Sequence, residues 1–128
     1  MHGDESPEAV ARLQHDFPVI KAIRVRESLR LRELAPFASA EAILLDGFDR
    51  KLPGGTGKTF RWAKARGTRR YAKIFLAGGL TPENVGEAIR VAKPFAVDAC
   101  SGVESEPGKK DPEKLRIFVA KARAAAQE

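Results

Sequence analysis

Two carboxylates stand out in this sequence because each one ends a short apolar run. Asp46 closes the run AILLD, and Asp98 lies inside the run FAVDAC. A carboxylate at the end of an apolar strand is poorly tolerated unless it caps a turn, pairs with a cation or takes part in proton transfer. We therefore interpret Asp46 as a functional acid, whereas Asp98 could equally orient a substrate hydroxyl or accept a hydrogen bond from a neighbouring backbone N–H.

Two glycine-containing loops follow apolar runs in the same way. Gly78 and Gly79 come directly after KIFLA, and Ser101 and Gly102 come just after FAVDAC. Loops of this kind, after the last two strands of a parallel sheet, commonly bind phosphate through their backbone N–H groups. A purely structural role, in which the glycines only allow the chain to turn, explains either loop alone. It explains two such loops at the same edge less well, so the pair predicts a phosphate cradle.

A third glycine-rich stretch, KLPGGTGKTF at residues 51–60, is similar to a nucleotide-binding P-loop. That motif needs a glycine five positions before the Gly-Lys-Thr, so that a run of N–H groups can wrap a polyphosphate. Leu52 occupies the required position. ATP hydrolysis is therefore not expected, and the loop either presents N–H groups to a single phosphate or makes a turn.

The elements that must position these residues follow from a repeated strand and helix pattern. Short apolar runs at 19–25, 42–48, 73–79 and 95–100 predict strands, and the segments between them have helical spacing. Strands joined by helices run parallel with right-handed crossovers, which predicts an α/β fold. The carboxyl ends of parallel strands meet at one edge, where Asp46, Asp98 and both glycine loops would gather. Four strands do not close a barrel, so two unpaired edges are expected.

Three helices are expected to open with a capping residue followed by proline, at Ser6-Pro7, Thr81-Pro82 and Asp111-Pro112. In the last helix Leu115, Val119 and Ala122 recur on one face, so this face is expected to dock on the sheet. Weaker helices are predicted at about 28–38 and 59–66.

Composition indicates one domain covering residues 1–128, with 43% hydrophobic and 31% charged residues. The single Cys100 has no partner for an internal disulfide and no His or Cys at metal-ligand spacing, so no metal and no cofactor are expected. The sequence has no run long enough to span a membrane and no export signal at its start, which predicts a cytoplasmic protein without a membrane partner.

The net charge of +6 raises nucleic acid as a partner, with RVRESLRLR at 24–32 and KARGTRRYAK at 64–73 as the basic runs. Acidic and apolar residues interrupt these runs, and no aromatic pair is placed to stack bases. We therefore predict no nucleic-acid partner, because a mildly positive field suits an anionic small substrate equally well.

The motifs LLDG, GGTGKTFRW, FLAGGLTPENVGEAI and VDACSGVESEPGKKDPEKLRIFV, with the opening HGDES, occur together and in this order. They resemble the C-terminal half of phosphoribosylanthranilate isomerase, a tryptophan-pathway enzyme with a (β/α)₈ TIM barrel. The resemblance extends from His2 to about Val119, and it implies that GGTGKTF is the loop after the sixth barrel strand. The fold expected from it is a set of parallel βα units, the C-terminal half only of such a barrel.

The resemblance also implies roles for individual residues. The family performs an Amadori rearrangement of N-(5-phosphoribosyl)anthranilate, in which a general acid protonates the ribose ring oxygen and a general base takes the C2 proton. Asp46 resembles the general acid and Asp98 the carboxylate that supports the sugar hydroxyls. The remaining expected substrate contacts are Gly78, Gly79, Ser101 and Gly102 in the phosphate cradle, Gly55, Thr56 and Gly57 closing over it, and His2 and Asp4 at the substrate rim.

The sequence departs from the family at the general base, which is a cysteine in a Lys-Ile-Cys-Gly-type motif on the first strand. Neither that motif nor the anthranilate-binding arginine after the second strand occurs here, and Cys100 stands where the family commonly has serine. We expect a chain that is not active alone and that pairs with the missing N-terminal half or with itself. The alternative is a non-catalytic phosphate-binding half-barrel or assembly module.

Overall fold

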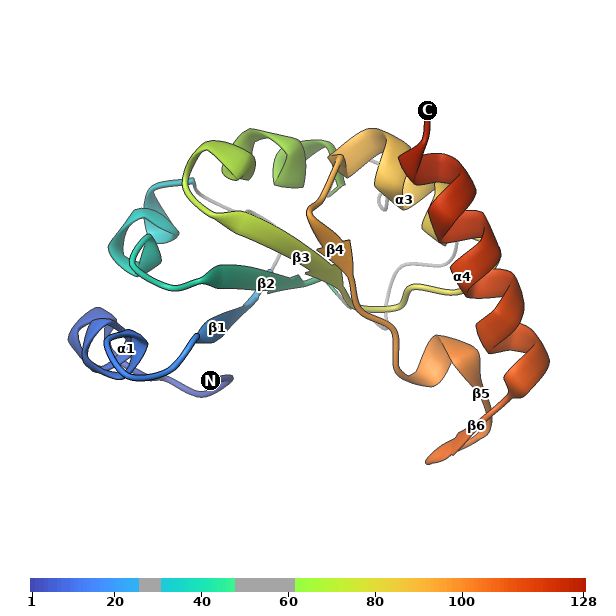
Figure 1. Cartoon of the computed structure of the whole chain (residues 1–128), viewed down its shortest axis with the longest axis horizontal. Coiled ribbons are helices and arrows are strands. Elements are labelled where there is room, and N and C mark those ends of the chain that lie inside the picture. The colour runs from blue at the N-terminus through green and yellow to red at the C-terminus, as the bar shows by residue number, and fades with distance from the viewer. Residues whose placement is uncertain (26–30, 48–61) are drawn as a thin grey trace.

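The computed structural model describes residues 1–25, 31–47 and 62–128. Its main sheet has the strand order β1-β2-β3-β4, and a two-stranded antiparallel sheet pairs β5 with β6. The strands are β1 (Ile20–Arg24), β2 (Ala42–Asp46), β3 (Lys73–Ala77), β4 (Ala96–Val97), β5 (Glu104–Glu106) and β6 (Lys109–Lys110). The α-helices labelled in Figure 1 are α1 (Pro7–Gln14), α3 (Val85–Ala92) and α4 (Pro112–Ala126).

All neighbouring strands of the main sheet run parallel, which confirms the α/β fold expected from the sequence. The register pairs Arg24 of β1 with Asp46 of β2, and Asp46 with Ala77 of β3. The four predicted strands are all present. The fourth is shorter than expected, because only Ala96 and Val97 pair with β3.

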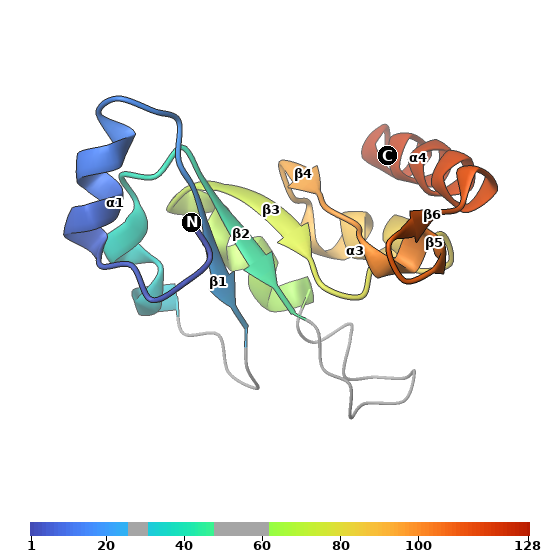
Figure 2. The ribbon, with the colours of Figure 1, turned by 90° about the horizontal axis from the view of Figure 1, so that it is seen from below.

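The two faces of the main sheet have different neighbours. Ile43 and Leu45 of β2 and Ile74 and Leu76 of β3 are buried in the core cluster that also contains residues of α3 and α4. Because side chains alternate along a strand, Leu44 and Asp46 point to the opposite face. Figure 1 shows α3 and α4 next to β4, at the opposite end of the sheet from α1, and Figure 2 shows the same order from below.

Two of the three expected capping residues stand directly at the start of a helix. Ser6 Oγ accepts a hydrogen bond from the Ala9 N–H at 3.2 Å and caps α1. Asp111 Oδ1 accepts from the N–H groups of Glu113 and Lys114 at 2.9 and 3.1 Å and caps α4.

The helix start expected at Thr81-Pro82 is right in its capping residue and wrong in its position, because α3 begins three residues later, at Val85. Residues 82–84 form a turn before it. The Asn84 side chain accepts from the Thr81 N–H at 2.8 Å. Thr81 Oγ1 accepts in turn from the Glu83 N–H at 3.2 Å, and the Thr81 carbonyl accepts from the Val85 N–H at 3.0 Å. These reciprocal side-chain bonds have the pattern of a capping box, so Thr81 caps the turn that leads into α3.

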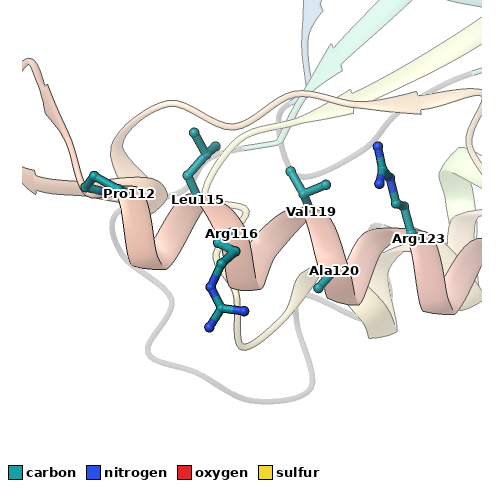
Figure 3. A pocket seen from close by; sticks show the side chains of 6 residues that line it. All are labelled: Pro112, Leu115, Arg116, Val119, Ala120 and Arg123. Carbon is teal, nitrogen blue, oxygen red and sulfur yellow. The ribbon is translucent and has the colours of Figure 1, made fainter.

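The docking face expected for α4 is also wrong in part. Phe118 and Ala125 are the buried residues of α4, with Ala122 packed against the same core, and this stripe lies against α3. Leu115 and Val119 remain 43% and 39% exposed. With Pro112, Arg116, Ala120 and Arg123 they line an open groove of about 460 Å³ on the outer side of α4 (Figure 3). The helix docks on its neighbouring helix rather than through the predicted stripe on the sheet.

The weaker helices are only partly present. The segment expected at about 28–38 contains two 3₁₀ turns, Leu31–Glu33 and Ala35–Phe37, where Pro36 limits helical hydrogen bonding. The segment expected at 59–66 is helical over 62–66 and continues into the 3₁₀ turn Gly67–Arg70. Residues 28–30 and 59–61 lie outside those that the structure describes. The hairpin of β5 and β6 was not predicted, although Pro107-Gly108 marks its turn.

The outer edge of β1 is partly paired by the start of the chain. The Met1 amino group donates to the Ile20 carbonyl at 3.0 Å, and the Ala22 N–H donates to the Met1 carbonyl at 2.8 Å. This is the pattern of a parallel bridge, so Met1 extends the parallel sheet by one position beyond β1. Within the described residues, no helix is both long enough and apolar enough to cross a bilayer.

Candidate active site

The carboxyl ends of β2, β3 and β4 bring both predicted carboxylates to one edge of the sheet. Asp46 is the register partner of Ala77, the last residue of β3. On the other side of β3, the Asp98 N–H donates to the Leu76 carbonyl at 2.8 Å and extends the pairing of β4 by one residue. The end of β3 therefore lies between Asp46 and Asp98.

Alternation places the two carboxylates on the same face. Asp46 is the register partner of Ala77, so the two side chains lie on one face. Ala96 is the register partner of Phe75, which lies two residues before Ala77, and Asp98 lies two residues after Ala96. Because side chains alternate along a strand, Asp98 lies on the face of Ala77 and Asp46. Asp46 is half-buried and Asp98 is exposed. The small side chain of Ala77 lies between the two strand ends, so two acidic groups flank one open position on the face that α3 and α4 do not cover.

The first glycine loop needs glycine for a conformational reason. Gly78 and Gly79 have φ angles of 89° and 66°, in the left-handed region that residues with a Cβ rarely adopt. Asn84 holds this loop, because its side-chain amide donates to the Gly79 carbonyl at 3.0 Å. No role is predicted for Asn84 from the sequence. Its position three residues after Thr81 was the available signal, since Asn side chains commonly bond to nearby backbone groups.

The second glycine loop needs glycine for a steric reason. A Cβ on Gly102 would lie 1.9 Å from the Leu80 carbonyl oxygen and 2.9 Å from its carbon. Gly102 belongs to the 3₁₀ turn Ser101–Val103, whose Val103 side chain is buried at 1% exposure. The loops after β3 and β4 are thus in direct van der Waals contact, and the two predicted cradle segments form one surface.

A polar cluster supports the second loop from the β5–β6 hairpin. Lys110 Nζ donates to the Cys100 carbonyl at 3.0 Å and to Glu104 Oε1 at 2.7 Å, and it lies 3.6 Å from Cys100 Sγ. Lys114 Nζ donates to the Glu104 carbonyl at 2.7 Å. The hydrogen bond from Lys110 lowers the pKa of Glu104 below its usual value, so this carboxyl is ionised at neutral pH. None of these contacts was anticipated, because the hairpin that creates them was not predicted.

The N-terminal segment lies on the far side of β1 from Asp46. His2 and Asp4 are exposed. Lys21, only 4% exposed, donates to the Gly3 carbonyl at 2.7 Å and to Glu5 Oε2 at 2.8 Å. The segment is therefore anchored to the sheet by a buried ammonium group that sequence reasoning missed. Hydrogen bonds to β1 hold Met1, Gly3 and Glu5 in place, and β1 separates this segment from Asp46 and Asp98.

Three of the predicted residues, Gly55, Thr56 and Gly57, lie outside the described part of the chain. Among the described residues, no group of three or more His, Cys, Asp or Glu side chains is arranged to hold a metal ion. The groove on α4 is lined by none of the predicted site residues. The site supported by the geometry is therefore the edge formed by Asp46, Asp98 and the two glycine loops.

Comparisons with known proteins identify the family of the chain. A family model described as N-(5'phosphoribosyl)anthranilate (PRA) isomerase matches residues 1–121. An N-(5'-phosphoribosyl)anthranilate isomerase of Geobacter metallireducens is 44% identical over 124 residues, which are 97% of this chain and 60% of that protein. The chain thus spans about three fifths of this relative's length.

Solved structures give the same result. The phosphoribosyl anthranilate isomerase of Thermotoga maritima superposes with a TM-score of 0.82 at 39% identity, covering 96% of this chain and 60% of that one. A second isomerase structure, in complex with reduced 1-(o-carboxyphenylamino)-1-deoxyribulose 5-phosphate, gives 0.78 at 35% identity over 96% and 57% of the two chains. These matches cover nearly all of the present chain and exceed what a shared fold alone would give. The chain belongs to the N-(5'-phosphoribosyl)anthranilate isomerase family.

Proposed function

We propose that this chain provides the acid and phosphate-binding part of a phosphoribosylanthranilate isomerase. The reaction is the Amadori rearrangement of N-(5-phosphoribosyl)anthranilate to 1-(2-carboxyphenylamino)-1-deoxyribulose 5-phosphate, in tryptophan biosynthesis. The observation that carries the proposal is the convergence of Asp46, Asp98 and the two touching glycine loops at one edge of a parallel sheet. Family membership supports the choice of reaction, and a phosphorylated analogue bound by a relative supports the substrate class.

The proposed architecture is the C-terminal half of a (β/α)₈ barrel, built by residues 1–128 as one domain. A four-stranded parallel sheet with helices on one face supports it, since eight such strands close a barrel. In this arrangement the uncovered face carrying Leu44, Asp46 and Phe75 becomes the barrel interior. The partner is then the remaining barrel strands or a second copy of the chain. A cytoplasmic location stays a prediction of the sequence.

Asp46 is assigned as the general acid that protonates the ribose ring oxygen and opens the ring. Its half-buried position at the end of β2 supports this role, because catalytic groups of parallel α/β folds lie at the carboxyl ends of the strands. Asp98, exposed on the same face across β3, is assigned to support the sugar hydroxyls. A solvent-facing carboxylate is suited to accepting hydrogen bonds from hydroxyl groups.

The phosphate is assigned to the surface made by the two glycine loops. Gly78, Gly79, Ser101 and Gly102 present closely spaced backbone N–H groups, which bind phosphate without a dedicated cation. Gly55, Thr56 and Gly57 remain proposed as the loop that closes over it. His2 and Asp4 remain proposed at the substrate rim, supported by the anchoring of their segment through Lys21.

The proposal assigns no general base within residues 1–128. The family's base is a cysteine in a Lys-Ile-Cys-Gly-type motif that this sequence does not contain. Cys100 is exposed beside Lys110, on the hairpin side of its loop, and we assign it a packing and hydrogen-bonding role. The C2 proton is therefore taken by a group outside these residues. The alternative, a non-catalytic phosphate-binding module, is not favoured, because the matched relatives are isomerases.

The test separates acid catalysis from phosphate binding. Asp46→Asn is expected to abolish isomerase turnover, measured as loss of substrate fluorescence with an N-terminal barrel segment of a relative supplied. Its phosphate affinity should stay close to wild type, because the cradle lies beyond β3. Asp16→Asn, an exposed change at the end of α1, is the matched control and should leave both quantities unchanged. Turnover retained by Asp46→Asn would remove this residue from the acid role.

A further inference from the structure

The loop that carries Ser101 and Gly102 is held by the buried Val103 side chain and by two main-chain hydrogen bonds. The Val103 N–H donates to the Cys100 carbonyl at 3.3 Å, and the Asp111 N–H donates to the Val103 carbonyl at 2.9 Å. The first of these is long for an N–H···O bond. These contacts hold the end of the turn at Val103, whereas the residue before the turn, Cys100, is also held by a side chain.

Lys110 holds Cys100 through its ammonium group. An ammonium group has three N–H donors, and Lys110 directs them to the Cys100 carbonyl, the Glu104 carboxylate and, more weakly, the Cys100 sulfur. The Glu104 side chain is only 12% exposed, so its ion pair with Lys110 is shielded from water on one side. The Cys100 carbonyl is thereby fixed one residue before the proposed cradle begins.

Lys110 is itself held in place by the hairpin. Glu104 and Lys110 are register partners across β5 and β6, and Lys114 at the start of α4 donates to the Glu104 carbonyl. Lys109, the neighbouring residue on β6, pairs only with Glu106 among the described residues, at 3.0 Å, and both side chains are largely exposed. Two adjacent lysines on one short strand therefore have different surroundings, and only one of them touches the loop.

We propose that Lys110 is a positioning residue for the phosphate cradle. Its ammonium group, held by the Glu104 carboxylate, donates to the Cys100 carbonyl and so keeps the Ser101–Gly102 turn in contact with the Gly78–Leu80 loop. The inference rests on the proposed function, because the anion that this cradle serves is the substrate phosphate. It gives the hairpin a purpose in the site, although the hairpin contributes no predicted substrate contact.

The experiment compares Lys110→Met with Lys109→Met in the full chain, using inorganic phosphate as the probe and backbone amide NMR as the readout. In the phosphate-free state, Lys110→Met should shift the amide signals of Ser101, Gly102 and Leu80, whereas Lys109→Met should leave them in place. In a phosphate titration, Lys110→Met should raise the dissociation constant about ten-fold, the effect of a lost charge-assisted hydrogen bond. Lys110→Arg should recover part of the affinity, because it keeps the charge.

The outcomes distinguish this inference from the proposed function. If the wild-type chain binds no phosphate, the assigned cradle is wrong, and the amide shifts of the phosphate-free variants still decide whether Lys110 positions the loop. If Lys110→Met and Lys109→Met give the same shifts and the same affinity, the positioning role is overturned. Should Lys110→Met fail to fold, Glu104→Gln removes the charge that holds the ammonium group. Wild-type affinity and wild-type loop signals in that variant would equally contradict the proposal.

Discussion

Replacing Gly102 by alanine tests whether contact between the two glycine loops shapes the site. The added Cβ would lie 1.9 Å from the Leu80 oxygen, and a carbon to oxygen contact normally needs about 3.3 Å. One of the loops must therefore move by roughly 1.4 Å, the difference between these distances. The obstructing atoms are backbone, which cannot rotate away as a side chain can.

The expected cost is that of overpacking a close contact, about 1–3 kcal/mol of unfolding free energy. The matched control is Gly86→Ala on α3, where the added Cβ would meet Arg90 Nη1 at 3.4 Å and Ala125 Cβ at 3.9 Å, ordinary contacts with movable side chains. Alanine in a helix interior is favoured over glycine by roughly 0.5–1 kcal/mol. The same chemical change is thus expected to destabilise at one glycine and to stabilise at the other.

Urea unfolding followed by circular dichroism measures both variants against wild type. Gly102→Ala should lower the transition midpoint and Gly86→Ala should raise it, with similar slopes. A displacement of about 1 Å at a positioned site costs up to about a hundred-fold in function. Phosphate affinity should therefore fall in Gly102→Ala and stay unchanged in Gly86→Ala. A Gly102→Ala protein with wild-type midpoint and affinity would refute the packing argument.

Two further predictions concern the ends of the described elements. Asp111→Ala should cost about 1 kcal/mol of unfolding free energy by removing the cap of α4, whereas Asp111→Asn should retain most of it, as urea titrations of both variants can show. The Lys21 ammonium lowers the pKa of Glu5 from 4.5 to about 2, so unfolding takes up a proton in this range. That contribution is complete above about pH 4.5 and is lost as pH falls towards 2. Glu5→Gln should therefore show a flatter decline in stability over this interval, and a decline as steep as wild type would exclude the pair as its cause.

The sheet and its functional edge were predictable because local signals and tertiary packing agree there. Buried parallel strands read as apolar runs, so Ala42–Asp46 and Lys73–Ala77 appear in the sequence with nearly their structural bounds. Once the strands are parallel, the residue after each run must lie at the same edge. The positions of Asp46 and Asp98 therefore followed from topology, and the family resemblance is confirmed by the matched isomerases.

Other features depend on contacts that no local pattern expresses. Leu115 and Val119 do lie on one apolar face of α4, as their spacing predicts, but this face is exposed. The buried face is the one that carries Phe118 and Ala125. An amphipathic stripe does not reveal its partner, and α4 packs on α3. Thr81 caps as its residue type predicts, yet residues 82–84 form a turn and the regular helix begins only at Val85.

The polar clusters were missed because each joins residues distant in sequence. Lys21 appears in the sequence as one charge within an apolar strand, and only the fold brings Gly3 and Glu5 onto its ammonium group. Lys110 reaches Cys100 only through a short hairpin whose strands are too brief to show alternation. Long-range polar contacts of this kind require coordinates.

The most direct test of the proposed function is consumption of N-(5-phosphoribosyl)anthranilate, followed by loss of its fluorescence. The assay is run with residues 1–128 alone and with the N-terminal two fifths of the Thermotoga maritima isomerase added. We predict turnover only in the mixture, because this chain supplies the acid and the phosphate cradle and the added segment supplies the base. Turnover by residues 1–128 alone would contradict the assignment of the base, and a silent mixture in which the two parts bind each other would contradict the isomerase assignment itself.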